Sequence, residues 1–495
     1  MFDPSLEQFD RKADPTLAPS IDAPESRELA RTAAEEGSVL LLNDGSLPLD
    51  PARVRSIAVV GPFGDGEAAE RAMLGGYSPG QPAKGTVTVA EGLRRRGFDV
   101  SVAVGCGAGV GGPSVTPADF DAAVALASKA DAVVVALGTT SCGCCVRCGN
   151  GEAGDRMSLE PEGKQLALLG AVVKAAKPRN TPVIVVLVHG RPMSFQGDGG
   201  NGGNGGGDAG NGGGNGGYGG GGGGSGAIGA NALAGVNAML STWRPGEEGG
   251  SAIANLLLGD TNPSGRLAQA WQRSAGYIHS PTSPWFQAHS SMVPGKYFGN
   301  GDGTPLTPLF PFGHGLSYTT FQYDGLAAST ASLPATWHSG LRFQLHLTVR
   351  NNGTRAGSTV VLAAYTRQTR GVVRHMKELC AFAKVHLNAG EERTVAMDVR
   401  VSDLARYDPY AARDAPPVEM STGGGGAHGG LSEYSYPGAW LIDGGAYTFF
   451  AAGCISNPAL RDAHHHGDPD CPYATAIDGV TVSIGREGEV FGRFV

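Results

Sequence analysis

One short segment of the sequence combines two carboxylates and a cation among glycines. It reads Gly149-Asn-Gly-Glu152-Ala-Gly-Asp155-Arg156 and follows an apolar run at 132–137. Glycines let the backbone approach a ligand closely, and a loop carboxylate can then act as a proton donor or acceptor. On the residues alone two interpretations stay open. Glu152 is a catalytic carboxylate, or it is a solvated loop acid beside a local ion pair of Asp155 with Arg156.

Four of the eight cysteines crowd together just before this segment, as Cys142, Cys144, Cys145 and Cys148. Thiolates at this density raise the hypothesis of a metal or redox module. Structural zinc sites, however, typically pair two separated Cys-x-x-Cys motifs, and no such pair is found here. A local disulfide or free thiols is the favoured interpretation. We therefore expect no metal ion and no cofactor.

The elements around Glu152 predict a mainly parallel α/β sheet with helices on both faces. Short apolar runs suited to doubly buried strands occur at 56–62, 100–104, 132–137 and 183–188. Helical patterns occur at 26–37, 89–96, 118–129, 161–176 and 247–258. Strands that alternate with helices indicate a doubly wound sheet, placed here at 25–320 after a linker at 1–24. Functional residues of such sheets lie beyond the carboxyl ends of the strands, where Glu152 falls.

The pattern changes after this domain. Residues 341–349 alternate strictly between apolar and polar side chains, and Asn351-Asn-Gly353 supplies a turn. Further short strands with turn signals predict an immunoglobulin-like, fibronectin type III-like β-sandwich at 335–455, followed by a C-terminal tail at 456–495. Two glycine-rich stretches interrupt the chain, at 197–226 and 423–430. The longer one has almost nothing to bury, so we expect a disordered insertion.

Composition excludes several classes of protein. The 495 residues, 41% of them hydrophobic, suffice for two to four domains. With 38 basic and 46 acidic residues the net charge is −8, which argues against a nucleic-acid partner. No apolar run reaches the roughly 18 residues of a membrane helix, so no membrane partner is expected. The first residues show no signal-peptide pattern, and the compartment stays open.

Three further groups lie near predicted strand or helix ends. His189-Gly-Arg191 follows the fourth strand and is a candidate for contact with a ligand or another domain. Trp243 with the turn at 245–250 is expected to close a strand-to-helix junction. Glu247 and Glu248 are expected to compensate a helix dipole, and His314 is expected to be a structural turn residue.

Many motifs, in the right order, resemble glycoside hydrolase family 3, and particularly its β-xylosidase and β-glucosidase members. The highly specific ones are Trp243-Arg-Pro-Gly-Glu-Glu-Gly-Gly250, Gly259-Asp-Thr-Asn-Pro-Ser-Gly-Arg-Leu267 and Phe310-Pro-Phe-Gly-His-Gly-Leu-Ser-Tyr318. Ile57-Ala-Val-Val-Gly-Pro62 resembles the first strand of the family's second domain, and Val349-Arg-Asn-Asn-Gly353 resembles part of its fibronectin type III-like domain. The match runs from about 25 to 455. It implies the family's second, α/β domain and its fibronectin type III-like domain.

The resemblance also implies roles for the Glu152 segment. Many family members read Glu-x-x-Asp-Arg around their acid/base glutamate, so Glu152 inherits that role and Asp155 and Arg156 become substrate-binding candidates. Two departures from the family are visible. β-Xylosidases often carry another glutamate where Asn150 stands, and the cysteine run replaces the usual loop.

The family's nucleophile, an aspartate, sits on a (β/α)₈ barrel that precedes these domains, and this sequence has no room for one. Retaining glycosidases need two carboxyl groups about 5–5.5 Å apart. We therefore expect no nucleophile in this chain, the barrel domain as a physical partner, and no appreciable turnover by the chain alone.

Two functions from different classes follow. The first is an exo-acting retaining glycosidase that breaks down xylan or arabinoxylan oligosaccharides, β-xylosidase more than β-glucosidase, present as a barrel-less fragment. Its substrate would be a β-linked xylo- or gluco-oligosaccharide. The second is a non-catalytic carbohydrate-binding or accessory protein that keeps only these domains.

Overall fold

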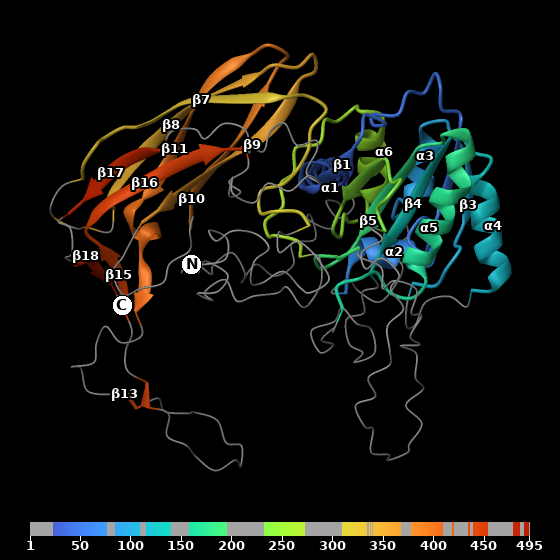
Figure 1. The fold of residues 1–495 in the computed structure, drawn as a ribbon, viewed down its shortest axis with the longest axis horizontal. Coiled ribbons are helices and arrows are strands. Elements are labelled where there is room, and N and C mark those ends of the chain that lie inside the picture. Colours follow the sequence, from blue (N-terminus) through green and yellow to red (C-terminus); the bar gives the residue numbers. More distant parts are fainter. Residues whose placement is uncertain are drawn as a thin grey trace, which may run out of the picture. The chain divides into compact units, whose positions relative to one another are not determined.

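The computed structural model describes residues 23–76, 85–108, 115–139, 158–195, 232–272, 309–333, 336, 338, 340–367, 378–408, 418–419, 434–435, 439–453, 479–485 and 490–494. The chain divides into two compact units (Figure 1). Unit 1 comprises Met1–Ile278 with Pro294–Tyr318, and unit 2 comprises His279–Val293 with Thr319–Val495. Each unit has its own hydrophobic core.

The described part of unit 1 is built on one six-stranded sheet of order β1-β6-β5-β4-β2-β3. Its strands are β1 (Val39–Asn43), β2 (Ser56–Val60), β3 (Asp99–Ala103), β4 (Ala132–Gly138), β5 (Val183–Val188) and β6 (Ala238–Ser241). All neighbours pair in parallel except β1, which runs antiparallel to β6. The predicted fold class is confirmed. The apolar runs located β2 to β5 but not β1 and β6.

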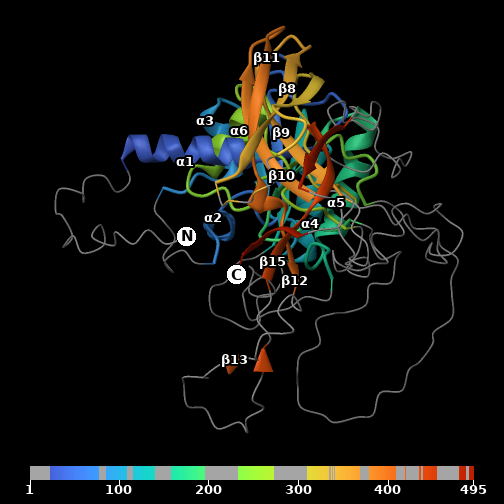
Figure 2. The ribbon, with the colours of Figure 1, turned by 90° about the vertical axis from the view of Figure 1, so that its left-hand side faces the viewer.

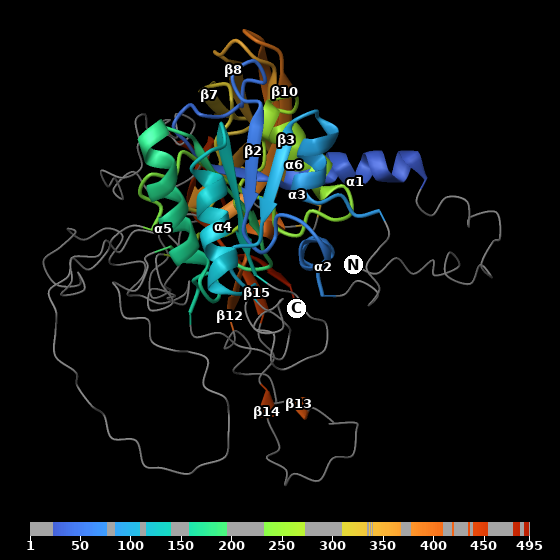
Figure 3. The same ribbon diagram turned by 90° about the vertical axis from the view of Figure 1, so that its right-hand side faces the viewer.

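Helices cover both faces of this sheet (Figure 3). They are α1 (Pro24–Gly37), α2 (Glu67–Leu74), α3 (Val89–Arg95), α4 (Pro117–Ala127), α5 (Gln165–Ala176) and α6 (Gly249–Leu258). Side chains of α2, α3 and α6 share one core cluster with Ile57 and Val59 of β2. Side chains of α4 and α5 share the other with Ala58 and Val60. The alternating side chains of one strand thus reach both faces, as in any doubly covered sheet.

Close backbone packing at the strand ends requires glycine at two positions. A Cβ at Gly61, after β2, would lie 2.3 Å from the carbonyl oxygen of Ala136. A Cβ at Gly138, the last residue of β4, would lie 1.8 Å from the carbonyl oxygen of Val188. Neither contact is physically possible, so these glycines let the neighbouring strands end side by side.

Unit 2 is a β-sandwich, as predicted (Figure 2). Its described strands are β7 (Phe321–Ala328), β8 (Arg342–Asn351), β9 (Gly357–Thr366), β10 (Glu378–Leu387), β11 (Glu392–Arg400), β12 (Arg406–Asp408), β13 (Val418–Glu419), β14 (Tyr434–Ser435), β15 (Ala439–Asp443), β16 (Gly445–Ala452), β17 (Val480–Ile484) and β18 (Val490–Phe494). The main sheets have the orders β10-β9-β16-β17 and β11-β8-β7. The alternating apolar residues of β8 point into their shared core.

Several expectations fall on residues that the structure does not describe. They include the linker, except residues 23 and 24, and the glycine-rich stretches 197–226 and 423–430. Within the stretch expected to be a tail, the structure describes β17, which pairs with β16, and β18, which pairs with β15. No helix among the described residues is long and apolar enough to cross a membrane.

Candidate active site

The residues singled out for chemistry, Glu152, Asp155 and Arg156, lie outside the described residues, as do Cys142 to Cys148. The structure describes the chain up to Thr139, directly after β4, and again from Ser158. It therefore describes the residues that precede and follow the segment 140–157. Side-chain hydrogen bonds hold Thr139 on one side of that segment and Leu159 and Glu160 on the other.

The carboxyl ends of the five parallel strands, β2 to β6, lie at this edge of the sheet. Thr139 follows β4, His189 follows β5, and Thr242 follows β6. All three side chains are buried, with exposed fractions of 0, 0 and 3%. Parallel sheets bind ligands at this edge, and buried polar side chains there need hydrogen-bond partners within the protein.

Arg244 holds the end of β4. Its Nη1 donates to the carbonyl oxygen of Thr139 and to that of Ala72, both at 2.9 Å, and its Nη2 donates to Oγ1 of Thr139 at 3.3 Å. Ala72 lies in the last turn of α2, where helix carbonyls lack partners in the helix. Burial lowers the pKa of Arg244 to about 10, so the guanidinium is still charged at neutral pH.

The backbone before Arg244 is strained. Trp243 has a φ of 53°, in the left-handed region that a bulky side chain rarely adopts. Such a conformation costs about 1–3 kcal/mol and is found mostly at functional sites. The carbonyl oxygen of Trp243 accepts a hydrogen bond from the backbone N–H of His189 at 2.9 Å. The strained turn joins β6 to α6 and sends Arg244 toward Thr139, which agrees with the junction role expected for Trp243.

His189 is a structural residue with a fixed tautomer. Its Nδ1 lies 2.8 Å from the carbonyl oxygen of Arg191, which can only accept, so Nδ1 carries the proton. Its Nε2 therefore accepts from the hydroxyl of Ser241, also at 2.8 Å. Burial lowers the pKa of His189 to about 3. The ring also packs against Trp243, with centroids 4.6 Å apart, and is 0% exposed, so the side chain is fully buried at this edge.

Arg191 holds the other end of the segment 140–157. Its Nη1 donates to the carbonyl oxygen of Leu159 at 2.8 Å, and its Nη2 donates to that of Glu160 at 3.0 Å. The backbone N–H of Ser194 donates to the same Leu159 carbonyl at 3.0 Å. The chain is thus held by the loop after β5 as it returns toward α5.

Gln165, the first residue of α5, ties the two ends together. Its Oε1 accepts from the backbone N–H of Gly138 at 2.9 Å. Its Nε2 donates to the carbonyl oxygens of Gly138 at 3.1 Å and Glu162 at 3.0 Å. The side chain is fully buried. The sequence reasoning missed Gln165 and assigned no role to Arg244, because both act through backbone carbonyls that leave no pattern in the sequence.

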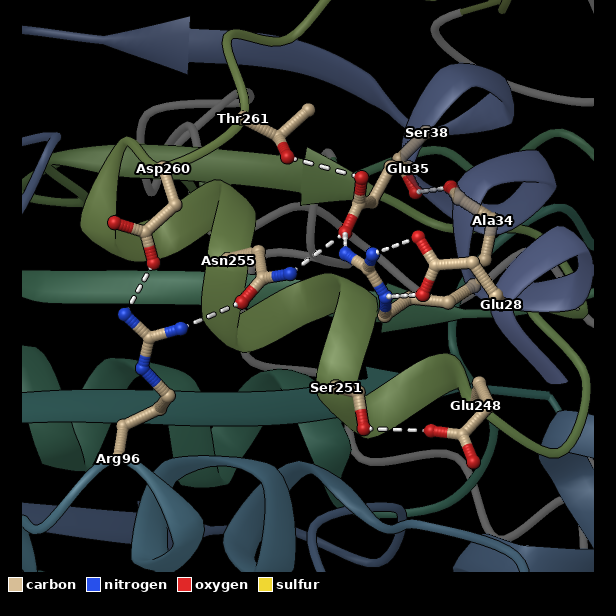
Figure 4. A network of polar contacts seen from close by, with 11 residues as sticks. Glu28, Ala34, Glu35, Ser38, Arg96, Glu248, Ser251, Asn255, Asp260 and Thr261 are labelled. Atoms are coloured by element: carbon tan, nitrogen blue, oxygen red, sulfur yellow. Dashed lines mark hydrogen bonds and ion pairs between the residues drawn. The ribbon is translucent and has the colours of Figure 1, made fainter. Parts of the chain in front are cut away.

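A second polar network lies between α1 and α6 (Figure 4). Glu35, 6% exposed, accepts hydrogen bonds from Arg31 at 2.5 Å, Asn255 at 2.7 Å and Thr261 at 2.9 Å. Arg31 also pairs with the exposed Glu28. Each donor and acceptor has a partner within unit 1, so this network fastens α1 and is no candidate for catalysis.

The remaining predicted groups are also structural. His314 is buried and its Nε2 lies 2.9 Å from the carbonyl oxygen of Leu41. Glu248 stands at the N-cap position of α6 without a side-chain capping hydrogen bond, and its carboxylate accepts from Arg27 at 2.6 Å and from the hydroxyl of Ser251 at 2.7 Å. Across the described residues of both units, no three His, Cys, Asp or Glu side chains are grouped to hold a metal ion.

Comparisons with known proteins agree with this architecture. The profile of the glycosyl hydrolase family 3 C-terminal domain matches residues 38–202 and 224–318, and that of the fibronectin type III-like domain matches residues 360–421. A β-xylosidase from Formosa agariphila is 31% identical over 77% of this chain and 45% of its own length. A periplasmic β-glucosidase from Salmonella typhimurium is 29% identical over 80% of this chain and 48% of its own length.

Solved structures give the same result. A β-glucosidase from Erythrobacter marinus superposes with a TM-score of 0.65 at 27% identity, over 95% of this chain and 52% of its own. The chain spans about half the length of the relatives it matches. The matched domains, their order and their folds together show that this chain belongs to glycoside hydrolase family 3.

Proposed function

We propose that this chain is the acid/base-bearing part of an exo-acting, retaining β-glycosidase of the β-xylosidase type. The observation that supports this most is the position of the Glu152-Ala-Gly-Asp155-Arg156 motif in the sequence. It lies between Thr139 and Leu159, two residues held at the carboxyl edge of a parallel sheet. Ligands bind at that edge in sheets of this kind.

In the proposed mechanism Glu152 protonates the glycosidic oxygen as the leaving group departs. After a covalent intermediate has formed, the same carboxylate removes a proton from the attacking water. Asp155 and Arg156 bind the sugar beside it. The nucleophilic aspartate belongs to a barrel domain outside this sequence. Without that second carboxylate no covalent intermediate forms, so the chain alone is inactive.

The proposed substrates are β-linked xylo-oligosaccharides. The similarity to the Formosa agariphila β-xylosidase supports this choice. A β-glucosidase is the second candidate, favoured by the similarity to the enzymes from Salmonella typhimurium and Erythrobacter marinus. The sugar contacts of the barrel would decide between the two.

Hydrolysis of p-nitrophenyl β-D-xyloside and β-D-glucoside tests the proposal in two samples. The chain alone is expected to release no nitrophenol. If it does release nitrophenol, and the Glu152→Gln variant does not, the chain contains a nucleophile of its own. The chain fused behind a barrel domain from a β-xylosidase relative is expected to hydrolyse the xyloside faster than the glucoside. If a folded fusion hydrolyses neither substrate, the chain is a non-catalytic accessory protein.

A further inference from the structure

Two neighbouring asparagines at the turn between β8 and β9 have very different surroundings. Asn351, the last residue of β8, is 0% exposed. Its Oδ1 accepts from Oγ1 of Thr319 at 2.6 Å and from the backbone N–H of Gly353 at 3.1 Å. Its Nδ2 donates to the carbonyl oxygens of Arg355 at 2.8 Å and Leu387 at 3.2 Å. The fold of the turn therefore depends on the side chain of Asn351.

The next residue, Asn352, is exposed. Its backbone N–H donates to the carbonyl oxygen of Thr320 at 2.8 Å, and its Nδ2 donates to Oε1 of Gln322, in β7, at 2.9 Å. A side-chain amide carries two N–H groups, so one hydrogen of Nδ2 is enough for the contact with Gln322. The second hydrogen can be replaced by another group without breaking that contact.

Asn352 begins the tripeptide Asn352-Gly-Thr354, which has the pattern of an N-linked glycosylation site. The sequence holds one other asparagine with serine or threonine two residues later, in Asn262-Pro-Ser264, and the proline between them excludes it. Acceptor asparagines lie in surface loops, and both Asn352 and Thr354 are exposed. The residue between them is fixed by packing, because a Cβ at Gly353 would lie 2.1 Å from Oγ1 of Thr319.

The strands next to this turn have a polar outer face. The side chains of β8 that point away from the core of the sandwich are those of Arg342, Gln344, His346, Thr348 and Arg350. On β7, Gln322 and Asp324 pair with Arg350 and Thr348, on the same face. An attached oligosaccharide is bulky and strongly hydrophilic, so it fits beside a polar face and would cover no apolar surface there.

We propose that Asn352 is the acceptor of an N-linked glycan, attached when this chain passes through the secretory pathway. The donor is a lipid-linked oligosaccharide diphosphate. In the transfer, Nδ2 of Asn352 forms a bond to C1 of the first sugar and loses one proton, while the bond from C1 to the diphosphate oxygen breaks and the lipid diphosphate leaves. The site lies in unit 2 and takes no part in the chemistry proposed for Glu152, so it does not depend on the proposed function.

Production of the full chain behind a secretion signal in yeast tests the proposal. An endoglycosidase trims an N-linked glycan to a single N-acetylglucosamine, which stays on its asparagine as a mass tag that peptide mass spectrometry locates. We expect the tag on Asn352 of the parent chain. The peptides are taken from all of the chain that the cells make, secreted or retained, so a variant that folds poorly is still read.

Two substitutions of Thr354 form a matched pair. Thr354→Ser keeps the hydroxyl that the pattern requires and should keep the tag on Asn352. Thr354→Val keeps the shape of the side chain but lacks the hydroxyl, and should lose the tag, as should Asn352→Gln. The proposal is overturned if Asn352 of the parent chain carries no tag, or if Thr354→Val carries it as fully as the parent chain does.

Hydrogen exchange of β8 in urea tests whether the folded turn accommodates the glycan. The glycosylated chain and the Asn352→Gln variant should lose the protection of β8 at the same urea concentration, because both keep the buried contacts of Asn351. Asn351→Gln is the matched control: it leaves Asn352-Gly-Thr354 intact but disrupts four hydrogen bonds of a buried amide, so β8 should lose protection at a lower urea concentration. A glycosylated chain as unstable as Asn351→Gln would overturn the proposal.

Discussion

The hydroxyl of Ser241 donates a hydrogen bond to Nε2 of His189 at 2.8 Å, across the ends of two neighbouring parallel strands. The Nδ1–H of the same ring donates to the carbonyl of Arg191. Both nitrogens are therefore occupied, and burial keeps the ring neutral. The histidine at the carboxyl edge of the sheet is consequently a structural link between β5 and β6 rather than a general base.

This link makes the stability of unit 1 sensitive to pH. The pKa of His189 is lowered to about 3 when folded, against about 6.5 when unfolded, so the unfolded chain binds the proton first as pH falls. The contribution of the neutral His189 side chain to the free energy of unfolding is complete well above pH 6.5 and is lost progressively as the pH falls. At pH 5 the loss is about 2 kcal/mol. Native-state hydrogen exchange of β5 in urea measures the loss. The free energy of unfolding of the His189→Gln variant should depend less on pH than that of the unmodified chain. The control His386→Gln, at an exposed position of unit 2, should leave the pH dependence unchanged. An identical slope in all three proteins would refute the prediction.

Gly138 and Gly170 offer a matched pair of glycine-to-alanine substitutions. Gly138→Ala forces β4 and β5 apart, because the new Cβ would meet the carbonyl of Val188, and should destabilise unit 1 by about 3 kcal/mol or more. Gly170 is exposed within α5 and has nothing within 4 Å of an added Cβ. Gly170→Ala should stabilise by about 0.5–1 kcal/mol. The free energies of unfolding of the two variants are measured in urea. Equal changes would contradict the close packing of Gly138 against the carbonyl of Val188.

The network around Glu35 predicts unequal effects for two glutamates that share Arg31. Glu35→Gln removes a buried carboxylate that accepts from three side chains and should cost about 3 kcal/mol in unfolding free energy. Glu28→Gln removes a carboxylate that is 62% exposed and should cost less than about 1 kcal/mol. Exchange of the α1 amides is the appropriate probe. A larger loss for Glu28→Gln would show that the burial of Glu35 does not matter.

Much of the fold follows from pattern alone. Continuous apolar runs identified β2, β4 and β5 because strands buried on both faces need no polar alternation. The run at 100–104 also located β3, but the expectation that it is buried on both faces is wrong, because β3 is the edge strand and its residues are exposed or half-buried. Strict alternation identified β8 for the opposite reason, since its polar side chains face outward. β1 was not predicted, although its residues Val39–Asn43 are largely apolar, because it follows a helix directly and pairs antiparallel with a strand far along the chain. Such pairing carries no local signal.

The site was predictable only in part. Motif resemblance singled out Glu152, Asp155 and Arg156, and their position in the sequence after the strand at 132–137 predicts that they lie at the carboxyl edge, a prediction on residues that the structure does not describe. Gln165 and Arg244, which hold this edge together with Arg191, were not identified, because their side chains satisfy backbone groups of Gly138, Thr139 and Ala72. Which carbonyl a side chain reaches depends on the tertiary arrangement of the strands.

The role of Glu152 is tested most directly by the dependence of turnover on the leaving group, in the chain fused behind a family barrel. A poor leaving group needs protonation, so Glu152→Gln should lower turnover of xylobiose by about 10²–10⁴-fold. The leaving group of an activated dinitrophenyl xyloside needs no protonation. Added azide attacks the covalent intermediate without a general base, so it should restore turnover of this substrate by the Glu152→Gln variant. Glu160→Gln, in the same region of the chain, should leave both substrates nearly unaffected. Equal losses for both substrates, with no rescue by azide, would contradict the assignment of Glu152 as the acid/base.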